Sequence, residues 1–251
     1  MRIIALLGAQ TVRELMRKKD FYVFFGMLCA VMFVLTRVSV FGQSDMSRFL
    51  KEAGLGLIYI FSLALAIPLT ARLLITELRD KTIYPLLAKP VSRLQVVLGK
   101  YCGALLAAEG SFSVFFLFFY LMTDHATDTA IAVYAQVFWF GALMLALVCA
   151  LSLFFSVFCT FSATVTLTAA VYVLMSWFGM DLVEPLWSVP PAGPALYYLL
   201  PHFEFYDIRV RLIHAWPPLS ASTVAAVSLY TLVYCGLLLA AAYWGFARKW
   251  L

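Results

Sequence analysis

The sequence predicts an all-α, polytopic membrane protein with six transmembrane helices, and two observations lead to this prediction. Hydrophobic residues make up 64% of the 251-residue chain and charged residues only 12%, which leaves too little polar surface for a soluble domain of this length. Six apolar runs also have the length of about 20 residues that a helix needs to cross the hydrocarbon core. They cover residues 21–41, 55–75, 101–122, 131–155, 161–180 and 224–246.

The N-terminal residues 1–20 are predicted to form a helix that lies along the membrane surface. Apolar residues between Ile4 and Leu15 fall near one helical face, and polar residues between Gln10 and Arg17 fall near the other. A solvated tail is the alternative. The segment does not resemble a cleaved signal peptide. Its basic cluster lies at residues 13–19, and the apolar run after it is longer than the apolar region of a signal peptide.

The fourth and fifth spans are predicted from one uncharged stretch. Residues 131–180 contain no charged side chain, and as a single helix they would be about 75 Å long at 1.5 Å per residue. That length is more than twice the thickness of the hydrocarbon core, so the stretch must fold back on itself. Cys159, Thr160 and Ser162 mark the expected turn.

The basic residues predict the orientation, since Lys and Arg are retained on the cytosolic side. With the N-terminus inside, thirteen of the 18 Lys and Arg residues are cytosolic. Both termini and the segment 77–100 are then cytosolic, and the segment 181–220 is outside. This distribution explains the net charge of +5 without a nucleic-acid partner.

The segment 77–100 is predicted to be a cytosolic docking element between the second and third spans. It starts with a charged stretch, Glu77 to Lys81, which solvent would surround, and continues with an apolar patch at Leu86 and Leu87. Pro90 ends any helix that forms before it. A plain connecting loop is the alternative interpretation.

The segment 181–220 contains seven of the ten prolines, which alternate with aromatic residues. This mixture suits the outer membrane interface. We expect short helices that re-enter the outer leaflet where protein or water satisfies their backbone. An aromatic-anchored loop with no part in transport is an equally good interpretation of the composition.

The sequence contains no catalytic signature, so we do not expect an enzyme. The Gly99–Lys100 pair has Leu94 where a phosphate-binding loop needs glycine and Tyr101 where it needs Ser or Thr. No metal site is predicted, because none of the three histidines has a Cys or carboxylate at ligand spacing. These histidines are His125, His202 and His214.

One ionisable residue, Glu109, lies inside the third predicted span. An acidic residue near the centre of a transmembrane helix costs roughly 2 to 3 kcal/mol on insertion scales, so Glu109 is expected to face protein or water. It could contact the substrate or the gate, or it could form a structural hydrogen bond to a neighbouring helix. The small residues around it, from Gly103 to Ser111, would allow close helix packing.

Three parts of the sequence resemble the type 2 ABC-transporter permease family. They are the six-span layout, the stretch from E-L-R-D-K-T to L-L-A-K-P-V-S-R-L-Q-V-V-L-G-K, and the ending W-G-F-A-R-K-W-L. The segment L-L-P-H-F-E-F-Y-D-I-R, which starts at Leu199, is similar to the outer loop of these permeases. The most specific positions are Glu77, Thr82, Leu86, Leu87, Pro90, Ser92, Arg93, Gly99 and Lys100.

This resemblance implies a half-transporter that exports its substrate. Two permeases, identical or different, would stand side by side, and each would rest on a separate cytosolic ATPase that holds the ATP and magnesium. The positions from Glu77 to Arg93 would then form the ATPase contact, and Glu109 would lie in the pathway or at an interface. The implied location is the cell membrane, expected to be a bacterial inner membrane, in contact with lipid.

Two other classes of membrane protein also fit the topology. A secondary transporter would be expected to have broken helices and coupling residues near the midplane, and only Pro68 and Glu109 hint at these features. A non-transporting anchor or assembly subunit is the other alternative. A secondary transporter would work without nucleotide, whereas transport by an ABC permease depends on nucleotide. An anchor or assembly subunit would show no transport activity.

Overall fold

The computed structural model describes residues 19–37, 43–79, 93–123, 131–178 and 200–248. Within these ranges every regular element is a helix, which confirms the predicted all-α class. The long helices are α2 (Lys19–Arg37), α3 (Gln43–Arg79), α5 (Arg93–Met122), α6 (Ile131–Phe158), α7 (Phe161–Phe178) and α11 (Ala221–Arg248). Two short elements, the 3-10 helix η1 (Phe203–Tyr206) and α10 (Arg209–Ile213), precede α11.

Five helices of the described part are long and apolar enough to cross a membrane: α3, α5, α6, α7 and α11. The first of the six predicted spans, 21–41, falls on α2, whose apolar stretch Phe21–Val31 is shorter than a span. A sixth span therefore stays a prediction. The predicted interfacial helix at residues 1–20 lies almost entirely outside the described residues.

Two of the helices start well before the apolar runs that predicted them. α3 starts at Gln43, whereas its apolar run starts at Leu55, so it also contains Lys51 and Glu52. α5 starts at Arg93 and not at Tyr101. The physical reason is that a helix satisfies its own backbone hydrogen bonds both in lipid and in water. A hydropathy run therefore marks only the part of a helix that lipid can surround.

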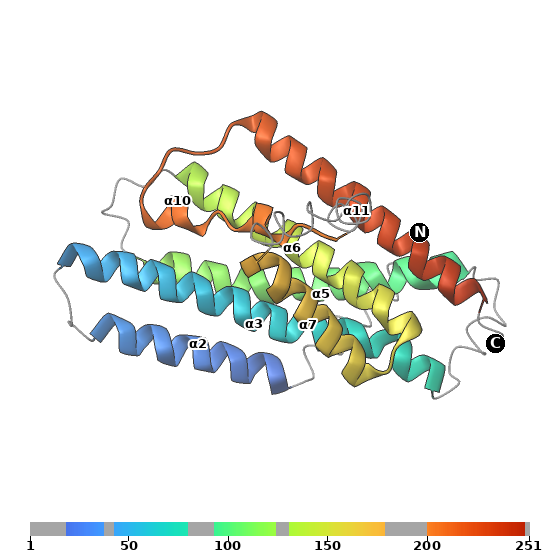
Figure 1. The fold of residues 1–251 in the computed structure, drawn as a ribbon. Coiled ribbons are helices and arrows are strands. Elements are labelled where there is room, and N and C mark those ends of the chain that lie inside the picture. Colours follow the sequence, from blue (N-terminus) through green and yellow to red (C-terminus); the bar gives the residue numbers. More distant parts are fainter. Residues whose placement is uncertain (1–18, 38–42, 80–92, 124–130, 179–199, 249–251) are drawn as a thin grey trace.

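α6 is the central helix of the bundle, and it contacts α3, α5, α7 and α11. In Figure 1, α2 lies at one edge of the bundle beside α3, and α11 lies at the opposite edge. Where α5 crosses α6, the fully buried ring of Phe112 packs directly over Gly141. A Cβ at position 141 would overlap this ring, so glycine is what lets the two helices approach here.

The chain turns sharply between α6 and α7. α6 ends at Phe158 and α7 begins at Phe161, so only Cys159 and Thr160 separate them, where the sequence predicted that the uncharged stretch folds back. The Cys159 N–H donates to the Phe155 carbonyl at 2.8 Å, and the Thr164 N–H donates to the Thr160 carbonyl at 2.8 Å. These bonds continue the helical pattern to both sides of the turn.

The segment that carries η1 and α10 packs into one end of the bundle, which we call the η1 end. The side chains of Phe203, Tyr206 and Leu212 are buried there. The Tyr206 hydroxyl lies 2.7 Å from the Thr231 hydroxyl of α11. The Gln136 amide of α6 exchanges two hydrogen bonds, of 2.9 and 2.8 Å, with the backbone of Leu219. The segment is therefore fixed to α6 and α11.

Candidate functional site

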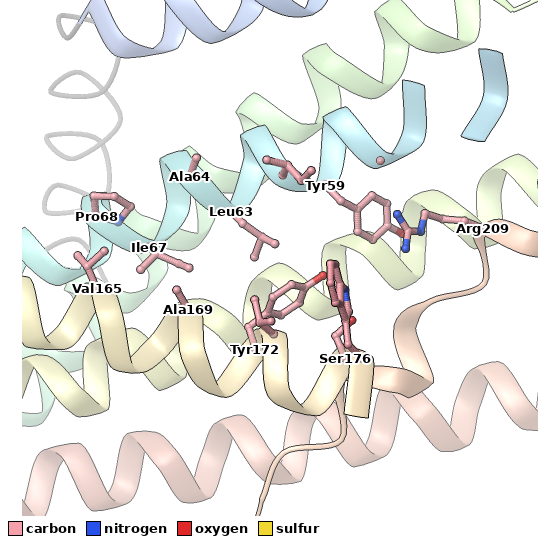
Figure 2. A pocket seen from close by; sticks show the side chains of 14 residues that line it. Tyr59, Leu63, Ala64, Ile67, Pro68, Val165, Ala169, Tyr172, Ser176 and Arg209 are labelled. Atoms are coloured by element: carbon pink, nitrogen blue, oxygen red, sulfur yellow. The ribbon is translucent and has the colours of Figure 1, made fainter. Parts of the chain in front are cut away.

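A groove of about 380 Å³ lies between α3 and α7 and continues to α10. We call it the α3–α7 groove. Its lining residues recur every three or four positions on each helix, so each helix contributes one face. The lining residues are Gly56, Tyr59, Ile60, Leu63, Ala64, Ile67 and Pro68 from α3, Val165, Ala169, Tyr172, Val173, Ser176 and Trp177 from α7, and Arg209 from α10 (Figure 2).

Pro68 lies within α3 and lines this groove. Proline has no N–H, so the helical hydrogen bond to the carbonyl of Ala64 is missing. Two hydroxyl groups donate to backbone carbonyls next to Pro68. Thr70 Oγ1 donates to the Ala66 carbonyl at 2.8 Å, and Ser152 Oγ of α6 donates to the Ile67 carbonyl at 3.2 Å. α3 remains helical through Pro68, and the Ser152 bond ties this part of α3 to α6.

At the η1 end of the groove, Asp207 holds the side chain of Arg209 in place. Arg209 Nε and Nη2 donate to the two carboxylate oxygens of Asp207, at 2.7 and 2.6 Å. Burial alone would raise the pKa of Asp207, but the hydrogen bonds from Arg209 outweigh this effect and keep that pKa below its ordinary value. In turn, the hydrogen bond with Asp207 raises the pKa of Arg209. Both groups therefore stay ionised near neutral pH.

The guanidinium of Arg209 stacks over Tyr59, with its central carbon 5.1 Å from the centre of the ring. The Tyr59 ring packs edge-on against Phe112 at 6.1 Å on its other side. Across the groove, Tyr172 of α7 packs against Phe203 of η1 at 5.1 Å. Figure 2 shows Tyr59 and Arg209 together at this end, with Tyr172 and Ser176 opposite them on α7. Aromatic and cationic groups from five elements, α3, α5, α7, η1 and α10, thus gather at this end of the groove.

Most of the predicted ATPase-coupling residues lie outside the described part of the chain: Thr82, Leu86, Leu87, Pro90 and Ser92. Glu77 belongs to the last turn of α3, and its side chain also lies outside the described part. Arg93 is the one whose side chain is described. The role of this group in ATPase contact stays a prediction.

Arg93 is the first residue of α5, and it contacts the end of α11. Its Nη1 donates to the carbonyl of Ala247 at 2.8 Å and lies 3.3 Å from that of Phe246. The guanidinium also lies 5.9 Å from the centre of the Phe246 ring. A cation is favourable there because the last carbonyls of a helix carry partial negative charge. The sequence predicted a rim contact with an ATPase for Arg93 and gave no sign of this link.

Glu109 lies half-buried on α5, at the border between the packed and the exposed face of that helix. Ala108 and Phe112 are buried on one side of it, and Leu106 is 60% exposed on the other. Glu109 does not line the α3–α7 groove. One side of Glu109 thus faces protein. The environment of its exposed side stays a prediction.

Among the described residues, no three His, Cys, Asp or Glu side chains are grouped so that they could hold a metal ion. His202 and Glu204 form a pair at the η1 end, with His202 Nδ1 3.4 Å from Glu204 Oε1. A pair of side chains is too few ligands for a protein metal site of the usual kind.

Sequence reasoning missed Tyr59, Asp207 and Arg209. These residues come from segments about 150 positions apart in the chain, and no short motif joins them. The one local signal was the Asp207–Arg209 spacing within the proline-rich segment, which allows the carboxylate to bond the arginine side chain two residues later. The groove itself exists because α3 and α7 lie side by side, and no local pattern predicts that arrangement.

Comparison with known proteins agrees with this membrane architecture. The chain matches the family model described as ABC-2 family transporter protein over residues 9–251. No curated protein matches the chain. The family match covers nearly the whole sequence, including α3, α7 and the segment that holds Arg209. The apolar helices are those of a multi-pass membrane permease, and membership of the family implies association with an ABC ATPase subunit. The chain therefore belongs to the ABC-2 transporter family.

Proposed function

We propose that this chain is the membrane-spanning subunit of an ATP-driven exporter, and that its α3–α7 groove forms part of the translocation pathway. The groove is the observation that carries this proposal. It combines an apolar lining with the cationic and hydroxyl groups of Arg209 and Tyr59, and Pro68 of α3 also lines it. A site that has to accept and release a ligand needs such a mixed lining.

In this proposal the chain carries out no ATP chemistry itself. ATP and magnesium bind a separate cytosolic ATPase, and a second permease, identical or different, completes the pathway. Both termini and the segment 77–100 are cytosolic, and the η1 end faces the outside of the cell membrane, where η1 and α10 re-enter the outer leaflet. The basic residues at 13–19 and 248–249 support this orientation.

The ATPase docks on the segment 77–100 through Leu86 and Leu87, with Glu77 and Arg93 at the rim. Burial of two leucines contributes roughly 3 to 6 kcal/mol, whereas an exposed ion pair contributes about 1 kcal/mol or less. The leucines should therefore dominate the contact. Closure of the ATPase pair would move this segment, and α3 and α5, which flank it, would carry the motion to the groove.

The double variant Leu86→Asp, Leu87→Asp tests this proposal. It should release the ATPase in a pull-down from solubilised membranes while the permease still inserts. Leu94→Asp tests whether the effect is specific to the Leu86–Leu87 patch, because Leu94 is an exposed leucine of the same segment outside that patch, and this variant should keep the ATPase. Retention of the ATPase at normal stoichiometry by the double variant would remove Leu86 and Leu87 from the interface. Transport without nucleotide would instead indicate a secondary transporter.

A further inference from the structure

The hydroxyl group of Tyr59 is buried at the η1 end of the α3–α7 groove and has no hydrogen-bond partner among the described residues. Tyr59 as a whole is 4% exposed. A buried hydroxyl without a partner is costly, and most such groups in proteins are satisfied. Its place in the lining of a groove therefore points to a ligand atom that accepts its hydrogen bond.

The guanidinium of Arg209 has further donors beside this hydroxyl. Asp207 takes one N–H each from Nε and Nη2, and no described residue accepts from Nη1. A Cβ at Gly56 would lie 3.9 Å from Nη1, so the glycine leaves space beside this nitrogen. Asp207 is not part of the lining. The positive end of the ion pair thus faces the groove, and its negative end faces away.

Away from Tyr59, Tyr172, Ser176 and Arg209, the groove is mainly apolar. Leu63 and Ile67 of α3 face Val165 and Ala169 of α7 (Figure 2). The volume of about 380 Å³ lies at the lower end of the range of about 300 to 1,000 Å³ that is typical of small-molecule sites. This space suits one slender apolar chain better than a lipid with two chains. A ligand that fits has an apolar body at Leu63 and Ala169 and an oxygen-rich head at Arg209.

We infer that the α3–α7 groove binds a single-chain amphiphile with an anionic oxygen head group. Its head accepts hydrogen bonds from the Tyr59 hydroxyl and from Arg209 Nη1, and its chain lies between Leu63, Ile67 and Ala169. A cationic head is excluded by its repulsion from Arg209, because a desolvated like-charge contact is unfavourable. This inference rests on the proposed function, since the amphiphile would be the exported substrate.

Tryptophan fluorescence can report this binding, because Trp177 lines the groove. The permease and its ATPase are reconstituted together in phosphatidylcholine nanodiscs at mildly alkaline pH. Dodecanoate with a bromine next to its carboxylate serves as the quenching probe. We expect saturable quenching that Trp177→Phe largely removes. Unlabelled dodecanoate should compete for the site, whereas dodecylamine should not.

Two variants test the two ends of the groove. Tyr59→Phe keeps the ring under Arg209 and removes only the hydroxyl, so it should weaken dodecanoate binding about tenfold, the effect of one hydrogen bond to a charged group. Ala169→Phe fills the apolar part and should abolish saturable quenching. Its matched control is Ala170→Phe, because Ala170 is exposed on α7 and does not line the groove. This control should bind as the wild type does.

Several results would overturn the inference. These are quenching that rises without saturation, equal competition by dodecylamine, or wild-type binding by Ala169→Phe. Displacement of the probe by a two-chain phosphatidic acid, with no effect of dodecanoate, would replace the single-chain ligand with a lipid. If the ATPase co-purifies but the probe does not bind, the ligand assignment fails and the proposed function stands. If no ATPase associates, the proposed function itself fails.

Discussion

Arg93 Nη1 donates to the carbonyl oxygen of Ala247 at 2.8 Å, and this bond joins the first residue of α5 to the last turn of α11. The two residues are 154 positions apart. Below this contact, Val97 of α5 packs with Ala242 and Phe246 of α11 and with Leu153 of α6. Arg93 belongs to the predicted coupling segment 77–100, and its bond to the last helix of the bundle provides a route by which motion of that segment would reach α11.

Replacement of Arg93 by Gln should loosen the end of α11. Loss of a hydrogen bond to a charged donor at a partly exposed site costs about 1 kcal/mol, so amide hydrogen exchange in the last turn of α11 should become roughly fivefold faster. Arg72→Gln is the control, because Arg72 stacks over Phe161 at 5.1 Å and makes no hydrogen bond to α11 among the described residues. Unchanged exchange in Arg93→Gln would show that the contact does not hold the helix end.

Gly141→Ala should destabilise the bundle, although alanine favours a helix by about 1 kcal/mol over glycine. The new Cβ would overlap the Phe112 ring, which is fully buried and packed against Phe138. Overpacking of this kind costs about 1 to 3 kcal/mol. Denaturant titration of the purified protein should show the loss of stability.

Gly245→Ala provides the control for Gly141→Ala. A Cβ at position 245 would overlap the Phe158 ring, but Phe158 is 57% exposed and its ring can turn away. We therefore expect little or no loss of stability in this variant. Equal destabilisation by the two variants would contradict the role given to the buried Phe112 ring.

The Glu109 variants separate a role of its charge from a structural role. Glu109→Gln keeps the size and the hydrogen-bonding groups and removes the charge, whereas Glu109→Leu removes both. If charge serves transport, Gln should impair transport nearly as much as Leu does. If the residue is structural, Gln should be tolerated, and Leu should lower the yield of assembled complex. Normal assembly and transport in both variants would leave Glu109 without either role.

Labelling of single cysteines tests the predicted orientation. Lys89→Cys and Asp128→Cys are introduced separately into a variant without the five native cysteines. An impermeant thiol reagent, added to intact cells, should label position 128 and not position 89, because the topology predicted from the Lys and Arg distribution places the connection between the third and fourth spans outside and Lys89 in the cytosol. The opposite labelling would invert the orientation, and the η1 end would then face the cytosol.

The sequence by itself determined the class of the protein and its family. Hydrophobic composition and run length fix which segments lipid can surround, because the bilayer sets a minimum apolar length for each span. The uncharged stretch 131–180 shows this well: its length alone required the turn that the structure places at Cys159 and Thr160. The E-L-R-D-K-T stretch likewise indicates the family through its local residue pattern, which does not depend on how the helices pack.

The tertiary structure alone decided where the candidate site lies. Tyr59, Ala169 and Arg209 belong to three segments, and nothing local in the sequence pairs them. In a membrane, apolar residues face both lipid and other helices, so hydropathy does not show which face of a helix packs inward. For the same reason, the sequence did not predict the contact of Phe112 with Gly141 or the hydrogen bond from Arg93 to Ala247. Side-chain packing settled these relationships, because only the shapes of neighbouring helices distinguish one apolar face from another.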